Sequence, residues 1–187
     1  MTFSVWMNIL RRVPDSVLWL LEYPEDAKAN LFKEAQARGV NPSRIIFTPK
    51  APKAEHINRC YLADLALDNM ITNGHTTSCD LLWSGCPMIT FPATVNMPSR
   101  VAASICQAVG CPEMIATDTV HYECLAVELA RDKSKLRALR NKVERCRLSE
   151  PLFDTERWVA DMEKGLLMAW QQFCTDGTKH HIEVPQS

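Results

Sequence analysis

Short apolar runs alternate with longer amphipathic segments between residues 6 and 109. The runs have the length of buried strands and stand at 16–21, 44–47, 65–68 and 88–91. Between them, apolar side chains recur at helical spacing, as Leu31, Phe32 and Ala35 do before Gly39, which marks a helix end. This alternation predicts an α/β fold in which helices cover both faces of a parallel sheet.

The chain after Ile115 has a helical pattern. Amphipathic segments at 120–130, 133–147 and 155–173 follow one another without a further strand. We therefore expect one folded unit over residues 1–174, with a helical C-terminal segment, and a flexible tail over residues 175–187. With 187 residues, the chain is long enough for one substantial core and hardly for two.

Composition and charge are those of an ordinary soluble globular domain, with 47% hydrophobic and 23% charged residues. The net charge of -1 argues against a nucleic-acid partner, which requires a clustered basic surplus. No run reaches the ~18 apolar residues of a membrane span, and no signal peptide opens the chain. Neither nucleic acid nor a membrane is therefore expected as a partner.

Eight cysteines are spread along the chain without a close pair at metal-ligand spacing. Such cysteines are typical of reduced, mostly buried thiols rather than of a disulfide framework. Together with the missing signal peptide, they predict a cytoplasmic or nuclear protein.

The segment 73–80 carries the strongest local signal for ligand binding. Asn73-Gly74 is a turn signal after an apolar run, and Thr76 or Thr77 is placed to cap the helix that follows. Free amide groups and the positive end of the helix dipole would then favour a phosphate. Asp80, one turn further on, suits a sugar diol. Many strand-turn-helix junctions of this kind hold no ligand, so the local pattern alone is not decisive.

A second polar set lies on the predicted helix 52–61. Lys53, His56 and Arg59 recur every three residues and so share one side of the helix. Lys53 suits a ribose or phosphate oxygen, His56 suits stacking on a planar base, and Arg59 suits bonding to the base edge. A solvated helix face is the alternative. Because ligands of open parallel sheets bind beyond the carboxyl ends of the strands, we expect this helix to meet the turn 74–77 and the loop 92–100 at one edge.

These residues resemble those of the protein O-linked N-acetylglucosamine (O-GlcNAc) transferases. The run 45–47 with Ala51-Pro52-Lys53 and Glu55-His56 looks like the uridine-binding segment of that family. The pair Leu67-Asp68 and the run Asn73-Gly74-His75-Thr76-Thr77 with Asp80 look like its phosphate and ribose segment. Other matching positions extend the resemblance over nearly the whole chain: Leu82-Trp83, Gly85, Pro87-Met88, 99–104, Gly110-Cys111, Ser149 and Pro151-Leu152-Phe153.

The resemblance implies the C-terminal lobe of a two-lobed glycosyltransferase of the B fold, with a Rossmann-like parallel sheet. The parent enzyme would transfer N-acetylglucosamine from UDP-GlcNAc to Ser or Thr hydroxyls of intracellular proteins, with inversion and without a metal. The Ala51 backbone and His56 would hold uracil, with Arg59 nearby, and Lys53 and Asp80 would hold the ribose.

The resemblance also implies that His75, Thr76 and Thr77 meet the diphosphate. In the loop after Met88, where the family normally has a glycine followed by Glu-Thr-Leu-Ala, this chain has Ala93 to Pro98. This difference concerns the contact with the donor sugar and not that with the nucleotide.

Several parts of the parent enzyme are expected to lie outside this chain. They are a strand with a glutamine and a phosphate-binding lysine upstream of Trp6, the acceptor-binding lobe with its catalytic histidine and aspartate, and the helical repeats. No catalytic residue is therefore assigned here, and we expect the chain alone to be inactive. Two alternatives remain open: a non-catalytic interaction module with a nucleotide-binding fold, and a related glycosyltransferase using another nucleotide sugar.

Overall fold

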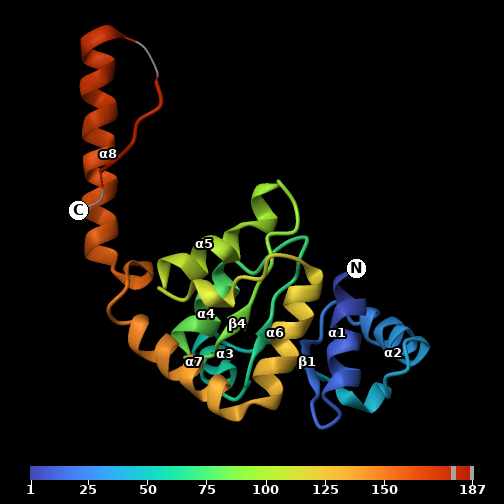
Figure 1. The fold of residues 1–187 in the computed structure, drawn as a ribbon. Coiled ribbons are helices and arrows are strands. Elements are labelled where there is room, and N and C mark those ends of the chain that lie inside the picture. The colour runs from blue at the N-terminus through green and yellow to red at the C-terminus, as the bar shows by residue number, and fades with distance from the viewer. Residues whose placement is uncertain (178–179, 186–187) are drawn as a thin grey trace.

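Helices and strands follow one another in the predicted order in the computed structural model, which describes residues 1–177 and 180–185 (Figure 1). The α-helices and strands are α1 (Thr2–Arg12), β1 (Leu18–Leu21), α2 (Ala27–Ala37), β2 (Ile45–Thr48), α3 (Lys53–Cys60), β3 (Ala66–Leu67), α4 (Thr76–Trp83), β4 (Met88–Ile89), α5 (Val101–Ala108), α6 (Thr119–Arg131), α7 (Lys133–Cys146) and α8 (Thr155–Asp176). Short 3-10 turns stand at Pro42–Arg44, Met97–Ser99, Pro112–Met114 and Pro151–Phe153.

The strands pair in parallel, as predicted, but they form two separate pairs rather than one sheet. β1 pairs with β2, and β3 pairs with β4. In Figure 1, β1 and β4 stand on either side of α6. A cleft of about 470 Å³ is lined by residues of β1 and of β3, including Leu20 and Leu67. The sheet is therefore interrupted between β1 and β3.

Within the described residues, the buried apolar side chains form one large cluster, in line with the expected single substantial core, and a second, smaller one. One cluster lies around β1 and β2 and includes Met7, Leu18 and Ile45. The other surrounds β4, α5 and α6 and includes Ile89. Trp6 of α1 packs against both clusters. The split follows from the interrupted sheet, because helices over separate strand pairs have no common layer to bury.

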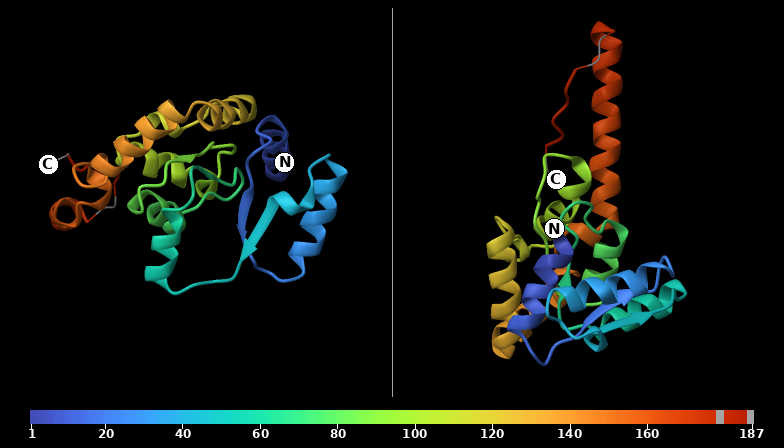
Figure 2. Two further views of the ribbon diagram at one scale, coloured as in Figure 1. Left: turned by 90° about the horizontal axis from the view of Figure 1, so that it is seen from below. Right: turned by 90° about the vertical axis from the view of Figure 1, so that its right-hand side faces the viewer.

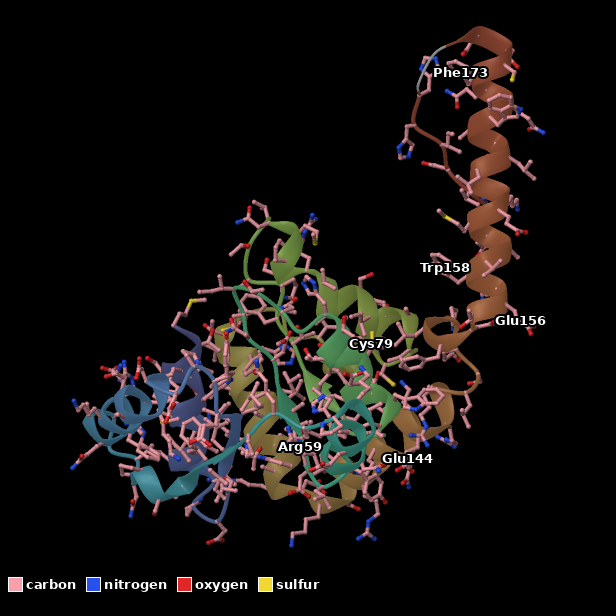
Figure 3. All side chains as sticks on the ribbon, turned by 180° about the vertical axis from the view of Figure 1, so that it is seen from behind. Arg59, Cys79, Glu144, Glu156, Trp158 and Phe173 are labelled. Atoms are coloured by element: carbon pink, nitrogen blue, oxygen red, sulfur yellow. The ribbon has the colours of Figure 1, made fainter. Side chains whose placement is uncertain are left out.

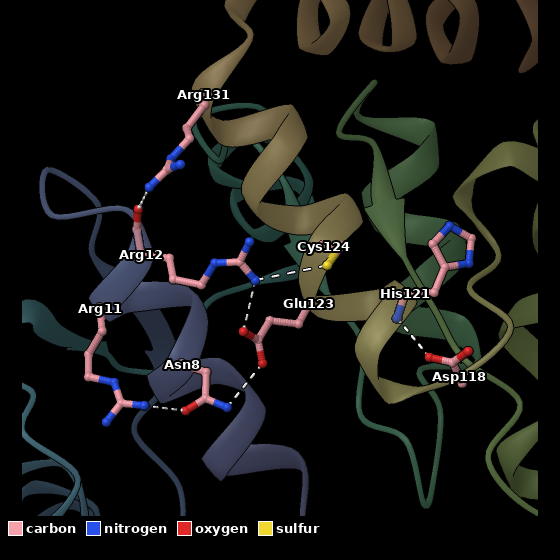
Figure 4. A network of polar contacts seen from close by, with 8 residues as sticks. All are labelled: Asn8, Arg11, Arg12, Asp118, His121, Glu123, Cys124 and Arg131. Carbon is pink, nitrogen blue, oxygen red and sulfur yellow. Dashed lines mark hydrogen bonds and ion pairs between the residues drawn. The ribbon is translucent and has the colours of Figure 1, made fainter.

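The contact between α1 and α6 joins the two halves (Figure 4). The Glu123 carboxylate accepts hydrogen bonds from Arg12 Nη1 at 2.9 Å and from Asn8 Nδ2 at 3.0 Å. Arg131 Nη2 donates to the backbone oxygen of Arg12 at 2.7 Å. Polar contacts at the rim and apolar packing by Trp6 thus hold the N-terminal strand pair against the rest of the chain.

Helix α8 extends away from the body (Figures 1 and 2). None of its residues is buried, and Trp158 and Trp170 remain 64% and 65% exposed. Figure 3 shows Trp158 and Phe173 on α8, well away from Arg59 and Cys79 on the body. Exposed apolar surface of this extent is typical of a face that another segment or chain covers.

The predicted flexible tail, 175–187, is only partly described. Its first two residues end α8, and the segment 180–185 runs back along that helix, where Lys164 Nζ donates to the backbone oxygen of Pro185 at 3.1 Å. Residues 178–179 and 186–187 lie outside the described residues, and the flexibility of the tail stays a prediction. Within residues 1–177 and 180–185, no helix has the length and apolar character needed to cross a bilayer.

Candidate nucleotide-sugar site

The turn between β3 and α4 leaves the start of α4 open. His75 occupies the N-cap position without a capping side-chain hydrogen bond, so the prediction that Thr76 or Thr77 caps the helix is wrong. Instead, Ser78 Oγ donates to the backbone oxygen of Gly74 at 2.8 Å, and this bond closes the turn from within. The Ser78 amide donates to the backbone oxygen of His75 at 3.1 Å, whereas the amides before it stand at the positive end of the helix dipole.

His75, Thr76 and Thr77 are exposed at this open helix end. Their side chains are therefore accessible to a ligand, together with the amide groups beside them. Such an end favours an anion without requiring a charged side chain.

Helices α3 and α4 bring together three of the predicted site residues. Lys53 Nζ lies 2.5 Å from Asp80 Oδ1, and His56 Nε2 lies 3.6 Å from Asp80 Oδ2. The Asp80 side chain is 12% exposed, whereas that of Lys53 is 60% exposed. A buried acceptor is thus held between a mobile cation and an imidazole, an arrangement that suits a diol with a planar base beside it.

Arg59 does not join the Asp80 cluster. Its Nη1 donates to the backbone oxygen of Pro49 at 2.9 Å, which ties the last turn of α3 to the loop before that helix. Ala51 lies half-buried in the same loop. Lys53 and His56 therefore share the face predicted from their spacing, whereas Arg59 holds the loop that carries Ala51.

The thiols near this site, Cys60 and Cys79, are packing groups. Cys60 Sγ lies 3.8 and 3.9 Å from the two ring nitrogens of His56, and burial raises the pKa of Cys60. Burial also raises the pKa of Cys79, despite its place in the first turns of α4. All eight cysteines are free, as predicted, although Cys124 and Cys174 are exposed.

Asp68, directly after β3, is a buried residue beneath the turn; it belongs to the segment that resembles the family's phosphate and ribose segment but is not among the predicted site residues. Its Oδ1 accepts hydrogen bonds from the amides of Gly74 at 2.7 Å and Asn69 at 2.9 Å, and its Oδ2 accepts one from Thr90 Oγ1 at 2.7 Å. Burial raises the pKa of Asp68, and these hydrogen bonds oppose that rise. A lone carboxylate ending an apolar run just before a turn was the available signal.

Asn73 ties the turn to the loop that departs from the family pattern. The backbone amide of Asn73 donates to the backbone oxygen of Pro98 at 2.8 Å, and its side-chain Oδ1 accepts a hydrogen bond from the backbone amide of Ala102 at 3.2 Å. In that loop Val95 and Met97 are exposed. The structure therefore connects the loop 93–98 to the turn before α4, as expected for neighbouring strand ends.

Within residues 1–177 and 180–185, no three His, Cys, Asp or Glu side chains are grouped as metal ligands. The expectation of a metal-independent reaction stays a prediction.

Residues 1–162 match the model of Glycosyl transferase family 41. This chain belongs to that family. Over 182 residues, it is 46% identical to a probable UDP-N-acetylglucosamine–peptide N-acetylglucosaminyltransferase of Arabidopsis thaliana, covering 97% of this chain and 18% of that protein. Over 181 residues, it is 42% identical to the UDP-N-acetylglucosamine–peptide N-acetylglucosaminyltransferase of Caenorhabditis elegans, covering 97% and 16%.

The family 41 chain also resembles a solved structure, that of a mutant O-GlcNAc transferase of Thermobaculum terrenum. The TM-score is 0.86 at 26% sequence identity, covering 94% of this chain and 34% of the other. The predicted fold, a Rossmann-like lobe of a B-fold glycosyltransferase, is confirmed. The chain spans less than a fifth of the length of these two curated relatives.

Proposed function

We propose that this chain is the UDP-GlcNAc-binding lobe of a protein O-GlcNAc transferase. The longer enzyme would transfer N-acetylglucosamine to Ser or Thr hydroxyls of cytoplasmic or nuclear proteins, with inversion and without a metal. One observation carries this proposal: the Lys53–His56–Asp80 cluster and the open start of α4 lie on the same helix pair in a family 41 chain.

Each part of UDP has a chemically suited partner in this arrangement. The ribose diol is suited to Asp80 and Lys53, and the uracil ring to His56 beside the Ala51 backbone. Arg59 holds the loop that presents Ala51. Binding would require the Lys53–Asp80 pair to open or to share its oxygens with the ribose hydroxyls.

The diphosphate is suited to the start of α4, with His75, Thr76 and Thr77. Negative charge grows on UDP as the glycosidic bond breaks. Preorganised amide groups and the helix dipole stabilise that charge without reorganising. This lobe would therefore contribute leaving-group stabilisation, while acceptor activation would come from the other lobe.

Two exposed apolar surfaces support the view that the lobe is incomplete by itself. The cleft between β1 and β3 is lined by residues of these strands and by Gly74, Thr77 and Ser78 of the turn, and we propose that a strand from another segment of the longer enzyme fills the part between the strands. The apolar side chains of α8 would be covered by the acceptor-binding lobe. The small share of the relatives that this chain covers agrees with both assignments. We therefore expect no sugar transfer by these residues alone.

The test is an NMR titration of the chain with UDP, with GDP at equal concentration as the control. We expect shifts at His56, His75 and Thr77 with UDP and much smaller ones at His56 with GDP. An Asp80→Asn variant should lose the response, whereas Asn58→Ala, an exposed change on α3, should keep it. Equal responses to both nucleotides would show phosphate recognition only, and no response to UDP would refute the proposed site.

The donor sugar requires a second titration, because the loop 93–98 departs from the family pattern. UDP-GlcNAc, UDP-N-acetylgalactosamine and UDP-glucose are compared with UDP. Extra shifts in the loop with UDP-GlcNAc alone would support the proposed donor. A stronger response to another sugar would favour the related-transferase alternative, and protein binding that is indifferent to UDP would favour an interaction module.

A further inference from the structure

We propose that Asp68 is a positioning residue for diphosphate binding, because its buried carboxylate holds the turn that presents the start of α4. Asp68 would not touch the nucleotide. It would act through Gly74, the residue directly before the N-cap. This inference rests on the proposed nucleotide site and adds a residue to it.

The Asp68 carboxylate is the main link between the turn and the strand layer. One oxygen takes the Gly74 amide at 2.7 Å and the Asn69 amide at 2.9 Å, so both arms of the turn bond to the same atom. The other oxygen takes the Thr90 hydroxyl at 2.7 Å, directly after β4. Through Asp68, the turn is thus bonded to residues that directly follow two paired strands, β3 and β4.

Asp68 itself is held rigidly. Its amide donates to the backbone oxygen of Ile89 at 3.0 Å, and its backbone oxygen accepts from Tyr122 Oη of α6 at 2.9 Å. Tyr122 is fully buried and in turn accepts a hydrogen bond from Trp6 Nε1 at 3.4 Å. Contacts with β4 and α6 therefore hold the Asp68 backbone in place, and the carboxylate in turn holds the Gly74 amide.

Gly74 packs closely between the Asp68 carboxylate and the first turn of helix α4. A Cβ on Gly74 would lie 2.4 Å from Ser78 Oγ and 2.9 Å from Thr77 Oγ1. Because the Gly74 backbone oxygen also accepts a hydrogen bond from Ser78 Oγ at 2.8 Å, a shift of Gly74 would disturb the first turn of α4, including the amide groups proposed to meet the diphosphate. Asp68 controls that shift because it bonds the Gly74 amide.

The negative charge of a buried carboxylate is unfavourable beneath a site that binds an anion. Asp68 therefore contributes there through the hydrogen bonds that it accepts. A carboxylate is an acceptor only, and here it receives three donors at once. An asparagine would keep an oxygen for the two amides, and its Nδ2 group would donate to Thr90 Oγ1. The Asp68→Asn variant is therefore the conservative replacement, and Asp68→Ala removes the anchor.

The experiment compares the affinities of UDP and uridine for the 187-residue chain by NMR titration. We expect Asp68→Ala to lower the affinity for UDP by about tenfold or more. The affinity for uridine should change by less than about twofold, because only UDP carries the diphosphate. Asp68→Asn should keep UDP affinity within about threefold. Asp64→Ala, an exposed change just before β3, is the matched control and should leave both ligands unchanged.

A change in protein stability alone would not alter the ratio of the two affinities. An Asp68→Ala chain whose ratio of UDP affinity to uridine affinity equals that of the wild type would overturn the positioning role. If Asp68→Ala fails to fold, Thr90→Val removes the second anchor of the carboxylate and should weaken UDP by about two- to fivefold relative to uridine. An unchanged ratio in that variant would overturn the inference as well. A wild-type chain that binds neither ligand would instead refute the proposed function, and the inference would fall with it.

Discussion

Replacing Gly74 with alanine tests how tightly the turn packs against α4. The added Cβ would meet Ser78 Oγ at 2.4 Å and Thr77 Oγ1 at 2.9 Å, both shorter than a van der Waals contact. Ser78 is 1% exposed, so its hydroxyl has little room to rotate away. Any such rotation would also break the hydrogen bond from Ser78 Oγ to the Gly74 oxygen.

The expected cost combines two opposing effects. Overpacking costs about 1–3 kcal/mol, and the lost hydrogen bond adds about 1 kcal/mol. Gly74 is not among the glycines with positive φ, so alanine would also restrict the unfolded chain and return about 0.4–1 kcal/mol. We therefore expect Gly74→Ala to lower the free energy of unfolding by about 1–3 kcal/mol.

Urea unfolding followed by circular dichroism measures this difference. Gly165→Ala is the control, because that glycine lies within helix α8 and its Cβ would meet Val184 Cγ2, the end of an exposed side chain, at 3.1 Å; alanine should be neutral or stabilising there by up to about 1 kcal/mol. UDP affinity of Gly74→Ala should fall together with stability, since the first turn of α4 must move. A Gly74→Ala chain that is as stable as wild type, or more stable, would refute the tight packing inferred for the turn.

Three other predictions concern the ribose, the buried network and the thiols. Asp80→Asn should weaken UDP about ten- to a hundredfold by calorimetry, through loss of a charge-assisted bond, and an unchanged affinity would remove Asp80 from the site. Tyr122→Phe should lower the free energy of unfolding, measured in urea, by about 1–3 kcal/mol, because the backbone oxygen of Asp68 loses the hydroxyl that donates to it. An unchanged free energy of unfolding would show that water replaces this donor. A thiol reagent at pH 8, read by mass spectrometry, should label exposed Cys124 well before Cys86, whose pKa burial raises to about 12. Equal labelling rates would contradict that burial.

Local pattern predicted most elements because each required only its own residues. The apolar run around Leu18 and the spacing of Leu31, Phe32 and Ala35 lie within elements that the structure contains, with ends shifted by a few residues. The position of Lys53 beside Asp80 followed from the rule that strand ends of a parallel sheet share one edge.

The errors arose where a residue's partner is distant or ambiguous. Thr76 and Thr77 are good capping residues, but Ser78 bonds to Gly74 and the helix begins one position earlier than a Thr77 start would give. Arg59 shares the periodicity of Lys53 and bonds to the nearby carbonyl of Pro49, and its role in binding the base stays a prediction. Side-chain hydrogen bonds depend on exact position, and spacing in the sequence specifies position only to within a turn of helix.

The sequence by itself determined the order of strands and helices, the exposed turn with His75 and Thr77, and the resemblance that leads to family 41. Tertiary structure alone decided that the sheet is interrupted between β1 and β3, that α8 keeps its apolar face exposed, and that Asp68 holds the turn. The physical reason is range. Helix and turn preferences are settled by neighbours a few residues away, whereas Asp68 depends on Thr90 and Tyr122, which only folding brings to it.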